Sequence, residues 1–315
     1  MANLRILFMG TAGLSCPSLR GLVAVPHFSV AAVVTQPDRP KGRELRPQPS
    51  PVKVTALELG LPVLQPERAR NQDFIGTLAG LKPDLIVVVA YGQILPQAIL
   101  DIPRFGCLNV HTSLLPKYRG AAPIQWAIVN GEAETGVTIM RMDAGLDTGD
   151  ILLQERTPIL PEDNSETLHD RLAQMGAALL LKTIPDYVSG HILPHRQPAD
   201  GGSYAARIKK EDGHIDWTQP AQLILNRLRG LTPWPGVFSF LEDGPRKHLL
   251  KIWRAEIVDG SGAPGQILRV EKSGISVACG EKALRILNLQ REGGKRLAAQ
   301  QFLGGYPLHE GQQLR

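Results

Sequence analysis

Residues 85–111 read LIVVVAYGQILPQAILDIPRFGCLNVH and contain two short apolar runs, Leu85–Val89 and Cys107–Val110. Short runs rich in valine and isoleucine are typical of strands buried on both faces of a sheet. Two similar runs precede them, Leu4–Phe8 and Val30–Thr35, with helical patterns in between. Strands alternating with helices predict an α/β domain with a doubly wound, mostly parallel sheet, which binds its ligands beyond the carboxyl ends of its strands.

Helix signals and further strands continue this domain. Ser50-Pro51 supplies an N-cap followed by a proline at the first helical position, which predicts a helix start there. We expect additional helices over Gln72–Gly80 and Ser165–Tyr187, and strands over Thr135–Met142 and Ile151–Thr157.

The pattern changes at residues 189–206, SGHILPHRQPADGGSYAA, where glycine, proline and polar residues indicate a linker. A helical stretch (Ala221–Leu228) and five short strands follow, at Val237–Leu241, His248–Ile257, Gln266–Val270, Ile275–Ala278 and Ala283–Leu289. Short strands with glycine-bearing turns predict a small barrel resembling the oligonucleotide-binding fold. We therefore expect a catalytic domain at 1–188, a linker at 189–206 and a C-terminal barrel at 207–315.

Composition narrows the class of protein. The chain has 315 residues, 43% of them hydrophobic and 21% charged, which is ordinary for a globular protein long enough for two domains. No apolar run approaches the roughly 18–20 residues that span a bilayer, and the N-terminus does not resemble a signal peptide. Cys16, Cys107 and Cys279 are scattered, which argues against disulfides and a cysteine zinc site. We expect a cytoplasmic monomer without a membrane partner or a metal.

Charge is distributed unevenly along the chain. Residues 207–315 carry 17 Lys and Arg against 11 Asp and Glu, whereas residues 1–206 carry 18 against 19. A basic last third fits a module that binds a polyanion, although a difference of this size fits a solubility preference equally well.

Candidate catalytic side chains lie at the end of one predicted strand. Asn109 and His111 are two residues apart, so on a strand their side chains project to the same side. A proline- and glycine-bearing segment, 113–120, follows them, and the glycines of the loop DAGLDTGD (143–150) allow Asp147 to bend back toward His111. Each feature alone also fits a structural role. A calcium loop is disfavoured because the spacing of an EF-hand is absent, and zinc would need a third ligand near His111.

The ordered set NVHTSLLPKYRGAAPIQWAIVNGEAETGVTIMRMDAGLDTGDIL, residues 109–152, resembles the folate-dependent formyltransferases. TQPDRPKGRELRPQPSPVK (35–53), VVVAYGQILP (87–96) and LTPWPG (231–236) are similar to the branch of that family that acts on methionyl-tRNA. One departure lies at Gly10–Ser15, where the family usually has a proline and an aromatic residue after Gly-Thr. That difference affects the shape of the loop but no expected catalytic group.

The resemblance implies transfer of the formyl group of 10-formyltetrahydrofolate to the amino group of methionyl-initiator-tRNA for translation initiation. In such a reaction an amine attacks the formyl carbon, and a tetrahedral oxyanion forms before the folate nitrogen leaves. Asn109 is then expected to donate a hydrogen bond to the oxyanion, His111 to donate or to move protons, and Asp147 to orient His111. Whether Asp147 alone or the Asp147–His111 pair is the base stays open.

The resemblance also implies where the two substrates bind. Folate contacts are expected at Ser113, Leu114, Leu115 and Pro116, and along Val88, Val89, Ala90, Tyr91, Gly92 and Ile94; the leucines fit an ordinary core equally well. The basic loop 36–53, with Arg39, Lys41, Arg43 and Arg46, is expected to enter the acceptor end of the tRNA, with Arg43 at the reading position.

In the barrel, Lys251 and Arg254 are candidates for contacts with the RNA backbone, together with Lys247, Arg269, Lys272, Arg291, Lys295 and Arg296. Because Lys251 and Arg254 are an odd number of residues apart, strand alternation predicts that they lie on opposite faces.

Other functions fit the sequence less well. A formyltransferase for nucleotide sugars or glycinamide ribonucleotide, or a formyl-folate hydrolase, would keep the Asn–His–Asp set, but the basic loop and basic last third favour tRNA. A non-catalytic RNA-binding protein would not need that set. A dinucleotide-dependent oxidoreductase is disfavoured because Gly10–Gly13 is not G-x-G-x-x-G and no acidic residue closes the second strand.

Overall fold

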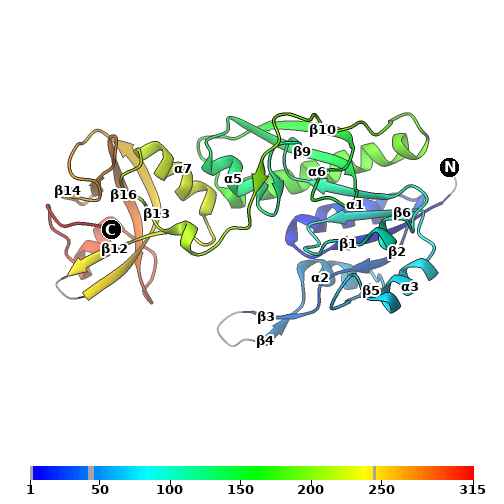
Figure 1. The fold of residues 1–315 in the computed structure, drawn as a ribbon. Coiled ribbons are helices and arrows are strands. Elements are labelled where there is room, and N and C mark those ends of the chain that lie inside the picture. Colours follow the sequence, from blue (N-terminus) through cyan, green and yellow to red (C-terminus); the bar gives the residue numbers. More distant parts are fainter. Residues whose placement is uncertain (1–2, 42–45, 244–245) are drawn as a thin grey trace. The chain divides into compact units, whose positions relative to one another are not determined.

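The computed structural model describes residues 3–41, 46–243 and 246–315. These residues divide into two compact units, which Figure 1 shows as ribbons. The first comprises residues 1–123, 134–158 and 169–205, and the second comprises 124–133, 159–168 and 206–315.

The first unit is built on a seven-stranded sheet with the order β10-β9-β7-β6-β1-β2-β5. Its strands are β1 (Leu4–Gly10), β2 (Phe28–Val34), β5 (Val63–Leu64), β6 (Leu85–Val89), β7 (Cys107–His111), β9 (Glu134–Arg141) and β10 (Ile151–Pro158). β5, β2, β1, β6 and β7 run parallel, whereas β9 and β10 are antiparallel to their neighbours. All five residues of β6 are buried, which explains its continuous apolar run. The predicted fold class is therefore confirmed.

Helices cover this sheet through small and apolar residues. They are α1 (Cys16–Ala24), α2 (Pro51–Glu58), α3 (Gln72–Gly80), α4 (Gln97–Leu100) and α6 (Ser165–Val188), of which α6 begins in the second unit. From its second residue on, α5 (Pro123–Val129) belongs to the second unit. Leu78 of α3 and Ile99 of α4 pack in one cluster with Leu7, Ile86 and other sheet residues. On α6, a Cβ at Gly176 would stand 2.8 Å from Val110, so glycine permits that close packing.

The helix start predicted at Ser50-Pro51 and the helix predicted over Gln72–Gly80 agree with the structure, whereas the helix predicted over Ala221–Leu228 extends to Leu231. The Ser50 hydroxyl accepts a hydrogen bond from the backbone N–H of Lys53, which caps α2. Asn71 caps α3 in the same way through the N–H groups of Asp73 and Phe74. A hairpin of β3 (Arg39–Lys41) and β4 (Arg46–Gln48) and the short pair β8 (Arg119–Gly120) and β11 (Tyr204–Ala205) were not predicted.

The second unit contains an antiparallel sheet with the order β12-β13-β16-β15-β14, and β17 (Leu297–Ala298) pairs with β16. The strands are β12 (Val237–Asp243), β13 (Arg246–Val258), β14 (Ile267–Glu271), β15 (Gly274–Ala278) and β16 (Ala283–Arg291), with α7 (Ala221–Leu231) before them and α8 (Ala299–Gly305) after them. Backbone bonds join Arg315 to Phe240 on β12, and Gln312 to Ile267 on β14. The last residues therefore bridge both edges of the sheet and close it into a barrel, as the spaced strands predict.

The prediction that Lys251 and Arg254 lie on opposite faces of β13 is wrong. Lys251 pairs with Gln290 and Arg254 with Asn288, and the register shifts on both sides of Arg254. A bulge adds a residue to one strand and interrupts the alternation of side chains. The residues opposite Lys251 and Arg254 are two apart, so both side chains lie on the same face of the sheet.

Candidate active site

The structure brings Asn109, His111 and Asp147 together at the carboxyl end of β7. One Asp147 oxygen accepts a hydrogen bond from the Asn109 amide at 3.3 Å. The other lies 3.7 Å from Nδ1 of His111, and the two side chains are only 15% and 7% exposed. In such a sheltered place, water screens the attraction between a carboxylate and an imidazolium only weakly. An amide, an imidazole and a carboxylate therefore form one cluster.

The tautomer of the neutral His111 ring follows from its second partner. Nε2 lies 2.9 Å from the backbone carbonyl of Tyr118, and a carbonyl oxygen can only accept a hydrogen bond. Nε2 therefore carries a proton, and Nδ1 of the neutral ring presents its lone pair toward Asp147. A proton taken up by His111 would be held on Nδ1, beside the carboxylate that stabilises it.

The loop between β9 and β10 carries Asp147 in a strained conformation. Its φ of 52° lies in the left-handed region, which non-glycine residues rarely adopt. The backbone N–H of Gly120 donates to Asp147 Oδ2 at 2.8 Å, so the carboxylate is held from the segment after β7. Glycine is required at 149, because a Cβ there would stand 1.9 Å from the carbonyl oxygen of Arg141.

Hydrogen bonds within the candidate folate segment and to β9 hold this segment in place after β7. The Ser113 hydroxyl donates to the carbonyl of Lys117 at 2.6 Å. The Leu115 N–H donates to the Thr138 hydroxyl at 3.2 Å, and the Leu115–Pro116 peptide is cis. The Leu115 side chain packs in a buried cluster with Met140 and Ile151. Leu115 is therefore core, whereas Leu114 is half-buried.

The second candidate folate segment follows β6 and bends sharply. Val88 and Val89 are buried in the sheet, whereas Ala90 and Gly92 adopt positive φ, and Ile94 is 81% exposed. The carbonyl of Tyr91 accepts hydrogen bonds at 2.9 Å from the side chains of Thr11 and Gln36, which follow β1 and β2. One backbone oxygen thus ties together the loops at the carboxyl ends of three neighbouring strands.

The Tyr91 side chain itself is buried, and its hydroxyl has no hydrogen-bond partner within the part of the chain that the structure describes. Burial raises the pKa of the Tyr91 phenol to about 12.

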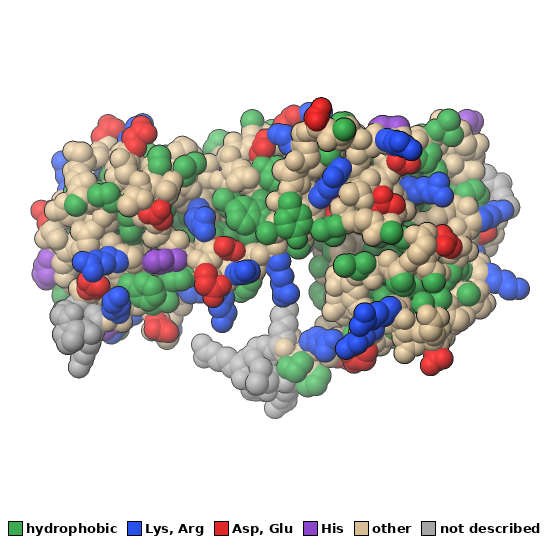
Figure 2. Space-filling view, in the orientation of Figure 1, with side chains coloured by type: hydrophobic (Ala, Val, Ile, Leu, Met, Phe, Trp, Pro, Cys, Tyr) green, Lys and Arg blue, Asp and Glu red, His purple; other side chains and the backbone are tan. Residues whose placement is uncertain are grey.

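Part of the basic loop lies within the described residues. Lys41 and Arg46 are backbone partners in the β3–β4 hairpin, and Arg39 forms an exposed ion pair with Glu67 at 3.5 Å. Arg43, the expected reading residue, lies outside the described residues. Figure 2 shows Lys and Arg side chains beside the base of this hairpin.

The base of the hairpin is anchored by an ion pair between Lys53 and Asp38, at 2.8 Å. The hydrogen bond from Lys53, with a second one from Gln65, lowers the pKa of the Asp38 carboxyl. The loop therefore starts from a fixed position on the first unit.

On the barrel, two cationic side chains lie close to the same aromatic ring. Arg296 lies over the Trp253 ring at 3.7 Å from its centroid, and Lys251 Nζ lies 5.8 Å from the same centroid. Lys251 also donates to the carbonyl of Pro235 at 3.3 Å, and Arg254 is exposed. Of the two candidate RNA contacts on β13, Lys251 is therefore half-buried and Arg254 is exposed.

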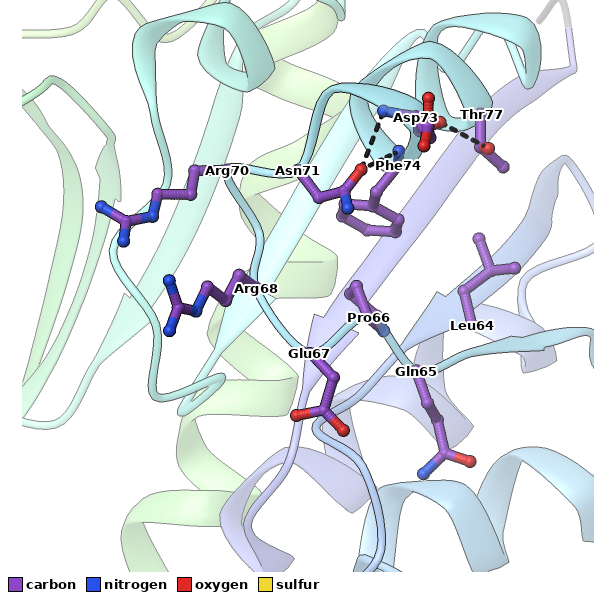
Figure 3. A pocket seen from close by; sticks show the side chains of 10 residues that line it. All are labelled: Leu64, Gln65, Pro66, Glu67, Arg68, Arg70, Asn71, Asp73, Phe74 and Thr77. Atoms are coloured by element: carbon purple, nitrogen blue, oxygen red, sulfur yellow. Dashed lines mark hydrogen bonds between the residues drawn. The ribbon is translucent and has the colours of Figure 1, made fainter.

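A separate pocket of about 630 Å³ lies after β5 and is lined by Leu64, Gln65, Pro66, Glu67, Arg68, Arg70, Asn71, Asp73, Phe74 and Thr77 (Figure 3). Arg68 and Arg70 extend in the same direction from its wall. None of these residues belongs to the Asn109 cluster, and three strands separate β5 from β7 in the sheet. We place the chemistry at Asn109, His111 and Asp147, because an amide, an imidazole and a carboxylate converge there and can together stabilise an oxyanion and move a proton.

In residues 3–41, 46–243 and 246–315, His, Cys, Asp and Glu side chains form no group of three or more that could hold a metal ion. Across the same residues, no helix has the length and apolar character needed to cross a membrane.

Three groups that hold members of the cluster in place were not predicted from the sequence. They are the Tyr118 carbonyl that binds His111, the Gly120 N–H that binds Asp147, and the Gln197 side chain, whose amide donates to the carbonyls of Asp147 and Gly149. Backbone groups carry no sequence signal of their own, and Gln197 lies in a segment that resembles a linker.

Comparison with protein families matches nearly the whole chain. The family described as formyl transferase matches residues 6–184, and the family described as formyl transferase, C-terminal domain, matches residues 207–307. The methionyl-tRNA formyltransferase of Citrifermentans bemidjiense is 54% identical over 311 residues, which are 99% of this chain and 96% of that protein. The enzyme of the same name from Geobacter sulfurreducens is 50% identical over 314 residues, 100% of this chain and 98% of that protein.

Solved structures share the fold at lower identity. HypX from Aquifex aeolicus in complex with tetrahydrofolic acid matches with a TM-score of 0.62 and 17% identity; the match covers 100% of this chain and 51% of HypX, so the chain spans about half the length of that protein. WlaRD, a sugar 3N-formyl transferase solved with dTDP and 5-N-formyl-THF, matches with a TM-score of 0.65 and 19% identity over 94% of this chain and 99% of WlaRD.

Proposed function

This chain belongs to the methionyl-tRNA formyltransferase family, and from that premise we propose that Asn109, His111 and Asp147 are its catalytic residues. The enzyme transfers a formyl group to methionyl-tRNA. We infer that the donor is 10-formyltetrahydrofolate, that the acceptor is the amino group of methionyl-initiator-tRNA, and that the product serves translation initiation. The observation that carries the residue assignment is the convergence of an amide, an imidazole and a carboxylate beyond the end of β7.

Asn109 stabilises the charge that develops on the formyl oxygen. Its amide nitrogen has two hydrogens, and the bond to Asp147 uses one of them. The second hydrogen is available to the oxygen of the tetrahedral intermediate. A positioned donor of this kind typically contributes about 10²–10³ to the rate.

His111 and Asp147 act together as the base that the incoming amine requires. As the amine attacks the formyl carbon, it must lose a proton, and the lone pair on Nδ1 of His111 accepts it. Asp147 stabilises the resulting imidazolium across 3.7 Å, while the Tyr118 carbonyl keeps Nε2 protonated and the ring fixed. The proton then passes to the folate nitrogen as the bond from that nitrogen to the formyl carbon breaks.

The remaining surfaces bind the two substrates. The donor lies against Ser113–Pro116 and the backbone of 88–94, where main-chain hydrogen-bonding groups and apolar side chains suit a pterin. The basic loop 36–53 contacts the acceptor end of the tRNA, and cations of the barrel, including Lys251 and Arg254, contact its backbone. In this scheme residues 1–188 form the catalytic domain, residues 189–206 link it to the C-terminal domain, and residues 207–315 bind tRNA. The enzyme works as a monomer in the cytoplasm.

The test is formylation of charged tRNA by the purified chain. With 10-formyltetrahydrofolate, initiator methionyl-tRNA should be formylated much faster than elongator methionyl-tRNA, and uncharged tRNA should not react. Equal rates on both charged tRNAs would contradict the initiator preference. Formylation of a nucleotide-linked amino sugar at a higher kcat/KM would contradict the choice of acceptor. The proposed monomeric state is tested by measuring the molar mass with size-exclusion chromatography and light scattering.

A further inference from the structure

Gln197 lies in the segment that resembles a linker, yet that segment is bonded to both loops of the candidate active site. The backbone of His195 pairs with Ile151, and β11 pairs with β8. The N–H of Tyr118, whose carbonyl binds His111, donates to the Ser203 hydroxyl at 2.9 Å. The segment from 195 to 205 therefore lies against the loops that carry the partners of His111.

Every hydrogen-bonding position of the Gln197 amide is used. Its Nε2 donates at 2.8 Å to the carbonyl of Asp147 and at 2.8 Å to the carbonyl of Gly149. Its Oε1 accepts from Nε and Nη2 of Arg119, at 3.0 and 2.6 Å. The partners dictate the orientation of the amide, because two carbonyls require the NH₂ group and a guanidinium requires the oxygen.

The Asp147 loop needs such an external anchor. Asp143 holds the beginning of the loop through the N–H of Gly145 and the Thr148 hydroxyl, and the N–H of Arg141 bonds to the Asp150 carbonyl at its end. Between these points Asp147 has a φ of 52°, a conformation that costs about 1–3 kcal/mol in a non-glycine residue and persists only when neighbouring groups hold it.

We propose that Gln197 is a positioning residue for the formyl transfer: its amide holds the strained Asp147 loop so that the carboxylate faces Nδ1 of His111. Through Arg119 it also ties this loop to the residue before Gly120, whose N–H donates to the same carboxylate. Gln197 thus acts on both sides of Asp147 without being part of the Asn109 cluster. The proposal rests on the proposed function, because it needs Asp147 to act through His111.

Two variants separate positioning from simple attachment of the segment. Gln197→Glu keeps the acceptor for Arg119 but removes both donors and places carboxylate oxygen against two carbonyls. Gln197→Met keeps the length of the side chain and removes all four bonds. The matched control is His195→Ala, since the side chain at 195 is exposed and its backbone bonds to Ile151 remain.

The expected result is a fall in kcat of about 10- to 100-fold for both Gln197 variants, with KM for folate donor and for tRNA within about twofold of the wild type, because displacement of a catalytic group by about 1 Å has effects of this size. The control should keep the wild-type kcat. Rates are referred to folded enzyme counted by near-ultraviolet circular dichroism, so partial unfolding does not imitate the effect. A wild-type kcat in Gln197→Glu would overturn the proposal.

A double-mutant cycle with Asp147→Asn gives a readout that attachment alone would not change. If Gln197 acts through the carboxylate, Gln197→Met should cost at most about twofold more in the Asp147→Asn background. Additive losses would show that Gln197 acts elsewhere and would overturn the proposal. A wild-type rate for Asp147→Asn alone would instead refute the proposed function of Asp147, so the two failures are distinguishable.

Discussion

Replacement of Asp147 by asparagine removes one charge and little else from the candidate active site. The side chain keeps its size, so Gly120 can still donate to its remaining oxygen. The new NH₂ group then takes the position of Oδ1 and faces the amide of Asn109, while the remaining oxygen faces Nδ1 of His111 without a negative charge to stabilise an imidazolium.

The size of the effect follows from the distance between the two groups. At 3.7 Å and an effective dielectric constant of about 20, a carboxylate stabilises an imidazolium by about 4 kcal/mol. If this stabilisation is present only while His111 holds the proton, kcat falls by about 10³-fold, since each 1.4 kcal/mol or so corresponds to a factor of ten. This value lies within the range of roughly 10²–10⁴ expected for general acid–base catalysis.

The assay is single-turnover formylation of charged initiator tRNA with saturating 10-formyltetrahydrofolate, in which formylmethionyl-tRNA is separated from methionyl-tRNA. Affinities for donor and tRNA, measured by titration, should stay close to those of the wild type. Asp143→Asn is the matched control, because Asp143 lies in the same loop, is exposed, and can still cap Gly145 through its remaining oxygen. A kcat for Asp147→Asn within about tenfold of the wild type would refute the assignment of the His111–Asp147 pair as the base.

Three further results are expected. Asn109→Ala should lower kcat by about 10²–10³-fold with little change in donor affinity, and a loss confined to KM would mean that Asn109 binds substrate without stabilising the oxyanion. Arg43→Ala should raise the KM for tRNA or lower kcat while the melting temperature is unchanged; tRNA kinetics identical to the wild type would remove the loop from the RNA contact. Tyr91→Phe should unfold at an equal or higher urea concentration, because the buried hydroxyl has no partner among the described residues and an unpaired one costs about 1–3 kcal/mol. Since the Tyr91 pKa rises from 10.0 to about 12 on folding, the unfolded chain ionises first, and the wild type should lose stability relative to Tyr91→Phe as the pH rises above 10. Destabilisation of the variant at neutral pH, or parallel alkaline curves, would contradict the buried, unpaired phenol.

Local patterns predicted the fold because they act between neighbours in the chain. The apolar run Leu85–Val89 is β6 to the residue, and Gln72–Gly80 is α3. The alternation of buried strands with capped helices specifies a doubly wound sheet, and the carboxyl ends of parallel strands lie at one edge of it. The sequence alone was therefore sufficient to select Asn109 and His111 on a single strand end and Asp147 in a glycine-bearing loop, and the resemblance added their catalytic roles.

Only the tertiary structure decided how those groups are arranged. The bond from Gly120 to Asp147 joins residues 27 apart, and the bond from Gln197 to Asp147 joins residues 50 apart. The bulge at Arg254 likewise depends on how β13 pairs with β16, and it reversed an inference from spacing. The spacing and composition of a segment predict how each residue is placed relative to its neighbours in the chain. Hydrogen bonds between distant segments instead depend on where the whole chain places a side chain and a backbone group, and backbone groups give no sequence signal of their own.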